Sequence, residues 1–174
     1  DFDAELRLLA AVRARYDRSQ VELRVDANGA FTPQNALSKI ERLAHYDLHS
    51  IEQPLPAGHP AELARLCATS PVPVALDEEL VACREVTPDV AARLLDDIHP
   101  HYIVLKPSLV GGFAGASCWM HAAQERGIGW WITSALESNV GLAAIARYTA
   151  SFHSEMPQGL GTGALYTNNI PSPL

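Results

Sequence analysis

The chain has 174 residues, of which 48% are hydrophobic and 19% are charged, and its formal net charge is −7. This composition is typical of a globular chain with a real core and argues against disorder. The sequence contains no Lys/Arg cluster that would neutralise phosphates, so we expect no nucleic-acid partner. No apolar run approaches the roughly 20 residues that cross a bilayer. The acidic start, DFDAEL, is unlike a signal peptide, and we expect a cytoplasmic protein without membrane contact.

Hydrophobic periodicity predicts helices and strands that alternate along the chain. Apolar residues spaced by three or four run from Phe2 to Tyr16, with acidic residues in the first turn, and predict an opening helix. The segments that follow are a strand at 21–25, a helix at 33–44 with Pro33 in its first turn, a strand at 49–52, a helix at 60–68, a strand at 72–76, a helix at 88–97, a strand at 102–105, a helix at 115–126, a strand at 129–133, a helix at 140–150 and a short extended piece at 158–160. This alternation predicts a parallel sheet of βα units covered by helices.

The predicted strands number fewer than the eight of a closed (β/α)₈ barrel, which usually needs about 250 residues. The chain also opens on a helix with no strand before it. We therefore expect an α/β fold that is a partial TIM-like (β/α) barrel, with residues 1–174 forming one partial domain. Material on the N-terminal side is expected to be missing.

Each of four successive predicted strands ends at an ionisable residue. VELRV is followed by Asp26, HSI by Glu52, VPVAL by Asp77 and YIVL by Lys106, at intervals of about one βα unit. In a parallel barrel the carboxyl ends of the strands converge on one face, where such folds place their active sites. Turn chemistry explains one acid at a strand end, whereas three acids and a lysine in register indicate a site.

Three converging carboxylates repel one another unless a cation lies between them. Oxygen ligands with room for water and substrate suit Mg²⁺ better than zinc, with Mn²⁺ as a substitute. Burial beside a cation disfavours the ammonium form of Lys106, which makes Lys106 a candidate for proton transfer. The alternative is an ion-pair network that only stabilises the barrel.

Cysteine and histidine offer no competing metal site. Cys67, Cys83 and Cys118 form an odd set without CxxC spacing, so we expect small apolar side chains rather than a zinc site or a disulfide framework. The seven histidines show no ligand pattern either.

The motifs RVDAN, IEQP, ALDEE and LKPS, in this order and spacing, resemble the enolase superfamily, in its muconate-lactonising-like branch. The segments SIEQPL, ALDEEL, YIVLKPSLVGGF, GWWITSALESNVGL and PQGLGTGALYTNN resemble the o-succinylbenzoate synthases of menaquinone biosynthesis over nearly the whole chain. The resemblance implies that Asp26, Glu52 and Asp77 are Mg²⁺ ligands and that Lys106 is the lysine of the sixth barrel strand. It also implies that a second-strand Lys-x-Lys motif and an N-terminal capping domain lie outside this sequence.

The reaction implied by the resemblance is a dehydration. 2-Succinyl-6-hydroxy-2,4-cyclohexadiene-1-carboxylate loses water to give o-succinylbenzoate, after removal of a proton α to a carboxylate and through a metal-stabilised enediolate. Since the second-strand lysine is the family's principal acid and base, Lys106 is assigned to electrostatic stabilisation of the intermediate. We expect a Mg²⁺-dependent carbon-oxygen lyase that acts on a small-molecule carboxylate, and we expect these 174 residues alone to be inactive.

Two other functions stay open. A racemase or epimerase of N-acylamino acids or dipeptides in the same superfamily uses the same metal triad, with lysines on both faces of the substrate. A non-catalytic metal-binding or scaffold fragment is favoured by the absent second-strand lysine, whereas the triad and Lys106 favour catalysis. The sequence does not indicate the oligomeric state.

Residues beside the predicted ligands have two interpretations. Asn28, two residues past Asp26, is expected to support the metal site, with an Asx turn as the alternative. Glu78 and Glu79 follow Asp77 directly, and we expect them to be solvated or ion-paired.

Two later motifs are candidates for substrate contacts. Ser134 lies three residues before Glu137, which predicts a capping box for a helix that begins near 138–139. The same position would allow Ser134 to meet a substrate carboxylate at the helix N-terminus. Gly161, within GLGTG, is expected in a tight turn beside the pocket.

Overall fold

The computed structural model describes residues 1–154 and 156–171, which divide into two compact units. The first unit comprises residues 1–79 and 97–101, and the second comprises residues 80–96 and the described residues from 102 onwards. In both units parallel strands alternate with helices, as the sequence predicts. The interpretation of residues 1–174 as one partial domain stays a prediction.

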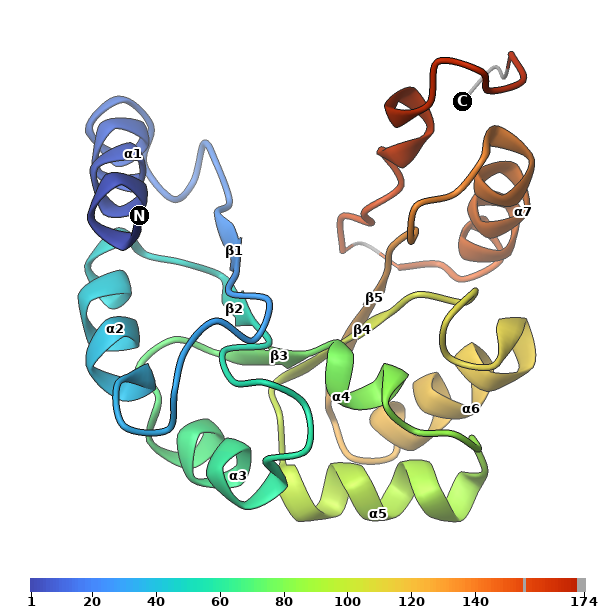
Figure 1. Ribbon diagram of the computed structural model, residues 1–174, viewed down its shortest axis with the longest axis horizontal. Helices are drawn as coiled ribbons and strands as arrows, with labels where there is room; N and C mark the ends of the chain where they lie inside the picture. Colours follow the sequence, from blue (N-terminus) through green and yellow to red (C-terminus); the bar gives the residue numbers. More distant parts are fainter. Residues whose placement is uncertain (155, 172–174) are drawn as a thin grey trace. The chain divides into compact units, whose positions relative to one another are not determined.

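The first unit contains three α-helices, a 3₁₀ helix and three short parallel strands, with the α-helices packed along one side of the strands (Figure 1). Strand β2 pairs with β1 and with β3. The elements are α1 (Phe2–Arg15), β1 (Arg24–Asp26), α2 (Ala36–Leu43), the 3₁₀ helix η1 (Ala44–Tyr46), β2 (Ser50–Glu52), α3 (Pro60–Thr69) and β3 (Val74–Leu76).

Helix α1 has the charge distribution that stabilises a helix. The Asp1 carboxylate accepts the N–H of Asp3 at 3.2 Å and caps the first turn. Acidic residues lie in the first turn and Arg13 and Arg15 lie in the last, so both signs oppose the partial charges of the helix ends. The opening helix predicted from the periodicity is confirmed.

The apolar residues of β2 and β3 form the buried part of this sheet, whereas β1 and the ends of β2 carry the polar residues Arg24, Asp26, Ser50 and Glu52. Ile51, Val74 and Leu76 have no exposed surface. This burial is expected where helices and other side chains cover both faces of a parallel sheet. The core leaves polar side chains only at the strand ends, which is where the candidate site lies.

The second unit has the same alternation around two parallel strands (Figure 1). Strand β4 pairs with β5, with Leu105 opposite Ile132, and both residues are completely buried, as is Trp119. The elements of this unit are the second half of α4 (Glu78–Val81) and most of α5 (Pro88–Ile98), then β4 (Tyr102–Leu105), α6 (Gly112–Gln124), β5 (Gly129–Ile132), α7 (Asn139–Ala150) and the 3₁₀ helix η2 (Thr162–Leu165).

Two predicted boundaries in the first unit are wrong for identifiable reasons. The strand predicted from residue 21 begins at Arg24, and the carbonyl of Val21 accepts a hydrogen bond from Arg13 Nη1 at 2.7 Å. The helix predicted from Pro33 begins at Ala36, because residues 32–35 form a turn in which Asn35 Oδ1 accepts the Thr32 N–H at 2.9 Å. Pro33 therefore lies before the helix.

The remaining differences concern short elements. The strand predicted from residue 72 begins at 74, and the helix predicted at 115–126 spans 112–124. The extended piece predicted at 158–160 makes a single parallel bridge, between Thr133 and Gly159. The elements α4, η1 and η2 were not predicted, since three or four residues are too few to establish a helical period.

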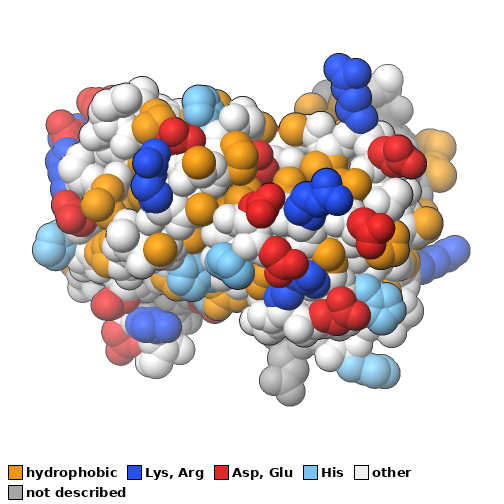
Figure 2. Space-filling model, turned by 90° about the horizontal axis from the view of Figure 1, so that it is seen from below, with side chains coloured by type: hydrophobic (Ala, Val, Ile, Leu, Met, Phe, Trp, Pro, Cys, Tyr) orange, Lys and Arg blue, Asp and Glu red, His pale blue; other side chains and the backbone are white. Residues whose placement is uncertain are grey.

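Neither the described helices nor the face drawn in Figure 2 suggest a membrane-spanning segment or a basic patch there. Within residues 1–154 and 156–171, no helix combines the length and the apolar character needed to cross a bilayer. On the face drawn in Figure 2, Lys and Arg side chains alternate with Asp and Glu among hydrophobic ones.

Candidate active site

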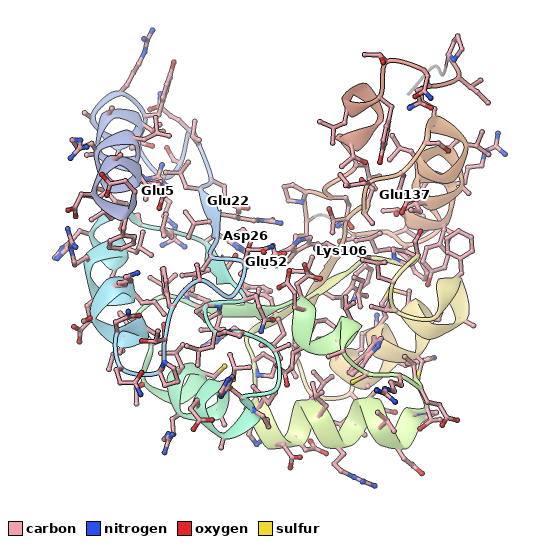
Figure 3. The ribbon with its side chains drawn as sticks, viewed as in Figure 1. Glu5, Glu22, Asp26, Glu52, Lys106 and Glu137 are labelled. Atoms are coloured by element: carbon pink, nitrogen blue, oxygen red, sulfur yellow. The ribbon has the colours of Figure 1, made fainter. Side chains whose placement is uncertain are left out.

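Three carboxylates lie at the carboxyl ends of the strands of the first unit, and we call them the carboxylate edge: Asp26, Glu52 and Asp77. Asp26 and Glu52 are direct partners in the β1–β2 register (Figure 3). Glu52 is also the partner of Ala75 in β3. Asp77 lies two residues beyond Ala75, so the alternation of an extended chain directs it to the same side. The strand positions thus bring all three predicted ligands to one edge.

Burial differs sharply along this edge. Asp77 is 0% exposed, Glu52 is half-buried and Asp26 is exposed. Carboxylate oxygens on one face of a sheet edge have the donor chemistry that a hard divalent cation requires, so the residues fit Mg²⁺. Among the described residues, however, no group of three or more His, Cys, Asp or Glu side chains is already placed to hold a metal ion. Ligation by the carboxylate edge stays a prediction.

Asn28 forms an Asx turn, the alternative interpretation given to it, whereas its support of a metal site stays a prediction. Its N–H donates to Asp26 Oδ1 at 2.7 Å, which is an Asx turn, and its φ of +45° is left-handed. Its Nδ2 donates to Glu78 Oε1 at 3.0 Å. The Asx turn is therefore present, and the side chain connects the loop after β1 to the first residue of α4.

Gln53 is a residue of this site that sequence analysis missed. It directly follows Glu52, it is 0% exposed, and its Oε1 accepts the N–H of Asp77 at 3.0 Å. The signal available in the sequence was an uncharged polar residue between a predicted ligand and the apolar stretch Pro54–Leu55.

Glu79 is buried, so the solvated state, one of the two expected for it, is wrong. It is 6% exposed, and its Oε2 accepts the N–H of Gly58 at 3.0 Å. Burial raises the pKa of this carboxyl, and the hydrogen bond from Gly58 partly opposes the rise. The loop that precedes α3 therefore covers Glu79, which an analysis of local sequence could not detect.

Lys106 and Glu137 are the charged residues at the corresponding end of the second unit (Figure 3). Lys106 follows β4 and is half-buried, and its carbonyl accepts the N–H groups of Leu109 and Val110 at 2.8 and 3.1 Å. Ser108 donates its hydroxyl to Glu137 Oε1 at 2.7 Å. Two loops that lie about thirty residues apart in the chain are thus joined by side chains.

The capping box predicted for Ser134 and Glu137 is wrong, although α7 begins at Asn139 as expected. Glu137 binds Ser108 instead. The partly buried N–H of Asn139 donates to Asn169 Oδ1 at 2.8 Å, so a side chain thirty residues away caps this helix.

Ser134 and Gly161 belong to neighbouring loops of the second unit. Ser134 is 5% exposed, its N–H donates to the carbonyl of Gly159 at 2.9 Å, and its Oγ lies 2.8 Å from Thr162 Oγ1. Gly161 has a φ of −95°, and a Cβ at this position would meet no atom within 4 Å. Substrate contacts by both residues stay predictions.

Comparison with known proteins gives a consistent set of relatives. The profile of the family "Enolase C-terminal domain-like" matches residues 1–169. An o-succinylbenzoate synthase of Desulfotalea psychrophila is 56% identical over all of this chain and 46% of its own length. A hydrophobic dipeptide epimerase of Roseobacter litoralis is 31% identical over 98% of this chain and 50% of its own length. The crystal structure of MenC from Desulfotalea psychrophila matches with a TM-score of 0.93 over 99% of this chain and 48% of its own. The chain spans about half the length of these relatives.

Proposed function

Because this chain belongs to the enolase C-terminal domain-like family, we propose that it forms part of a Mg²⁺-dependent o-succinylbenzoate synthase of menaquinone biosynthesis. The prediction of an enolase-type (β/α) fold is confirmed by the same family match and by the TM-score of 0.93. The proposed enzyme is a cytoplasmic carbon-oxygen lyase. Its substrate is the small-molecule carboxylate named in the sequence analysis, from which it removes water.

The observation that carries the proposal is the carboxylate edge. Three carboxylates end three paired strands on one side, in a chain that is 56% identical along its whole length to a protein named for this activity. Hydrogen bonds also hold the loop after β1 at this edge, since Asp26 accepts the N–H of Asn28 and the Asn28 side chain donates to Glu78.

The residues of the chain have separate tasks in the proposed reaction. Asp26, Glu52 and Asp77 would hold Mg²⁺, which when bound neutralises negative charge that develops on the substrate carboxylate. The family resemblance assigns to Lys106 a second positive charge that would stabilise that carboxylate as the α proton leaves. The proton goes to a base outside these 174 residues. The hydroxyl group on the neighbouring carbon then departs with a proton as water, and the ring becomes aromatic.

An epimerase is the second candidate, because the Roseobacter litoralis relative is named for that activity at 31% identity. Epimerisation also begins with removal of a proton α to a carboxylate-derived group. It ends with return of the proton to the same carbon, so no water is lost. The products therefore separate the two candidates.

We would test the proposal with the full-length gene product that contains these residues. The protein is given the cyclohexadiene substrate in Mg²⁺ or in EDTA, and formation of the aromatic product is followed by ultraviolet absorbance. Turnover that needs Mg²⁺ supports the lyase. Absence of turnover by folded, Mg²⁺-loaded protein contradicts it, and hydrophobic dipeptides are then assayed by exchange of the α proton with deuterium from solvent.

A further inference from the structure

Gln53 lies at the carboxyl end of β2 and is completely buried. Its backbone connects the strand ends of the first unit, since its N–H donates to the carbonyl of Ala75 at 2.8 Å and its carbonyl accepts the N–H of Gly29 at 2.7 Å. Its φ of +34° is a conformation that side-chain-bearing residues rarely adopt. The surrounding structure therefore holds this residue at a fixed point between the loop after β1 and strand β3.

Both the oxygen and the nitrogen of the Gln53 side-chain amide make hydrogen bonds. Oε1 accepts two N–H groups, those of Asp77 at 3.0 Å and Glu79 at 3.3 Å, and Nε2 donates to the carbonyl of Leu55 at 2.8 Å. The reversed orientation of the amide would place donors against donors, so the three partners define its orientation. The amide is therefore a rigid connection between β2 and the chain that leaves β3.

This connection acts directly on Asp77, which is itself completely buried. Gln53 follows Glu52 in the chain and binds the peptide N–H of Asp77, so one residue sets the spacing between the two carboxylates. Groups that share a metal ion must be held to about 0.5 Å, and their supporting hydrogen bonds influence metal affinity.

We propose that Gln53 is a positioning residue that holds Asp77 and Glu52 at the spacing needed to bind one divalent cation. The inference rests on the proposed function only in taking these two carboxylates as ligands. Gln53 itself contacts neither the cation nor the substrate. Its effect is on the affinity of the site for Mg²⁺.

The test uses Gln53→Met in the full-length gene product, since methionine has a similar length but places a methyl group, which accepts no hydrogen bond, where glutamine has Oε1. Isothermal titration calorimetry with MgCl₂, without substrate, should show affinity weakened by about 10- to 100-fold. Turnover should recover at least partly when the Mg²⁺ concentration is raised, because the cation and not the chemistry is limiting.

Ser50→Ala is the matched control, at the opposite end of the same strand. Ser50 is 1% exposed and lies 3.0 Å from His49 Nδ1 through its Oγ. Both substitutions should lower the melting temperature, but Ser50→Ala should leave the Mg²⁺ affinity within about twofold of wild type. An unchanged affinity in folded Gln53→Met would overturn the inference.

A second variant keeps the test decisive should Gln53→Met not fold. Gln53→Asn retains an amide and suits a positive φ, but its shorter side chain cannot keep all three hydrogen bonds. It should weaken Mg²⁺ binding at least tenfold, and an unchanged affinity again overturns the inference.

The calorimetric result is independent of the proposed reaction. If the protein binds Mg²⁺ through a Gln53-dependent site but makes no aromatic product, the proposed function is contradicted and the inference about Gln53 holds. If the wild-type protein makes the product and Gln53→Met binds Mg²⁺ with unchanged affinity, only the inference about Gln53 is contradicted.

Discussion

The two units hold their candidate residues in different ways. In the first unit the carboxylate edge is fixed by backbone hydrogen bonds between neighbouring strand ends, such as Ala27 N–H to the Glu52 carbonyl at 3.0 Å. In the second unit a backbone bond from the Ser134 N–H to the Gly159 carbonyl, at 2.9 Å, is accompanied by an exposed side-chain bond between distant loops, from Ser108 to Glu137. We infer that substitutions at the carboxylate edge will affect chemistry most, whereas substitutions in the loops of the second unit will affect local stability.

The largest effect is expected for Asp77→Asn. An amide keeps the shape of the buried side chain but removes the negative charge that the cation requires, and kcat/KM for the aromatic product should fall by about 10²-fold or more. The ultraviolet assay of the full-length gene product measures it. Glu41→Gln, an exposed acid on α2, is the control and should stay within about twofold of wild type.

A matched pair of glycines probes the loop that carries η2. A Cβ at Gly163 would collide with Asn139 Oδ1 and lie 3.0 Å from Leu142 Cδ2, so Gly163→Ala should destabilise the protein by about 1–3 kcal/mol. Gly161→Ala meets no atom within 4 Å and should be neutral or slightly stabilising. Urea unfolding compares the two variants. Equal destabilisation would contradict this description of the loop.

The same pair tests the substrate contact expected of Gly161. The added methyl group has space in the structure, so a loss of kcat/KM without a loss of stability would indicate that the substrate occupies this space. Unchanged kinetics would argue against a substrate contact here.

The hydrogen bond between Ser108 and Glu137 should have a smaller effect. Ser108→Ala removes a 2.7 Å bond at an exposed position, and we expect a loss of about 0.5–1.5 kcal/mol. Ser138→Ala is the control, because the Ser138 hydroxyl makes no capping bond to α7. A control that loses as much stability as Ser108→Ala would show that the bond does not stabilise the loops.

The smallest expected effect is a pH dependence in the first unit. His101 Nδ1 accepts the N–H of Val74 at 3.2 Å, and burial lowers the pKa of the imidazole below 6.5. The unfolded chain therefore takes up the proton first, so this contribution to stability is complete above pH 6.5 and is lost as pH falls through the lower folded-state pKa. Urea midpoints between pH 7.5 and 5.5 should fall more in wild type than in His101→Gln, and parallel curves would contradict the assignment.

The carboxylate edge was predictable because it follows from strand periodicity. Asp26, Glu52 and Asp77 each come at the end of an apolar run, and a parallel sheet brings such positions to one edge whatever the loops do. Helices α1 and α7 were predictable for a similar reason, since their apolar spacing and charges are local features.

Contacts that depend on loop paths were not predictable. Asn169 caps α7 from thirty residues away, and Glu137 binds Ser108 rather than closing a capping box. Glu79, expected to be solvated or ion-paired, is covered by the loop around Gly58. Local sequence identifies the polar groups that need a hydrogen-bond partner. Which distant residue becomes that partner depends on the path of the loops in the folded chain.

The most direct test of the account is a crystal structure of the full-length gene product soaked in Mn²⁺, with the anomalous signal used to locate the ion. We predict one peak per chain within bonding distance of carboxylate oxygens from Asp26, Glu52 and Asp77. A fully occupied peak elsewhere, or no peak at this edge in crystals that bind Mn²⁺, would contradict the assignment of the carboxylate edge as the metal site.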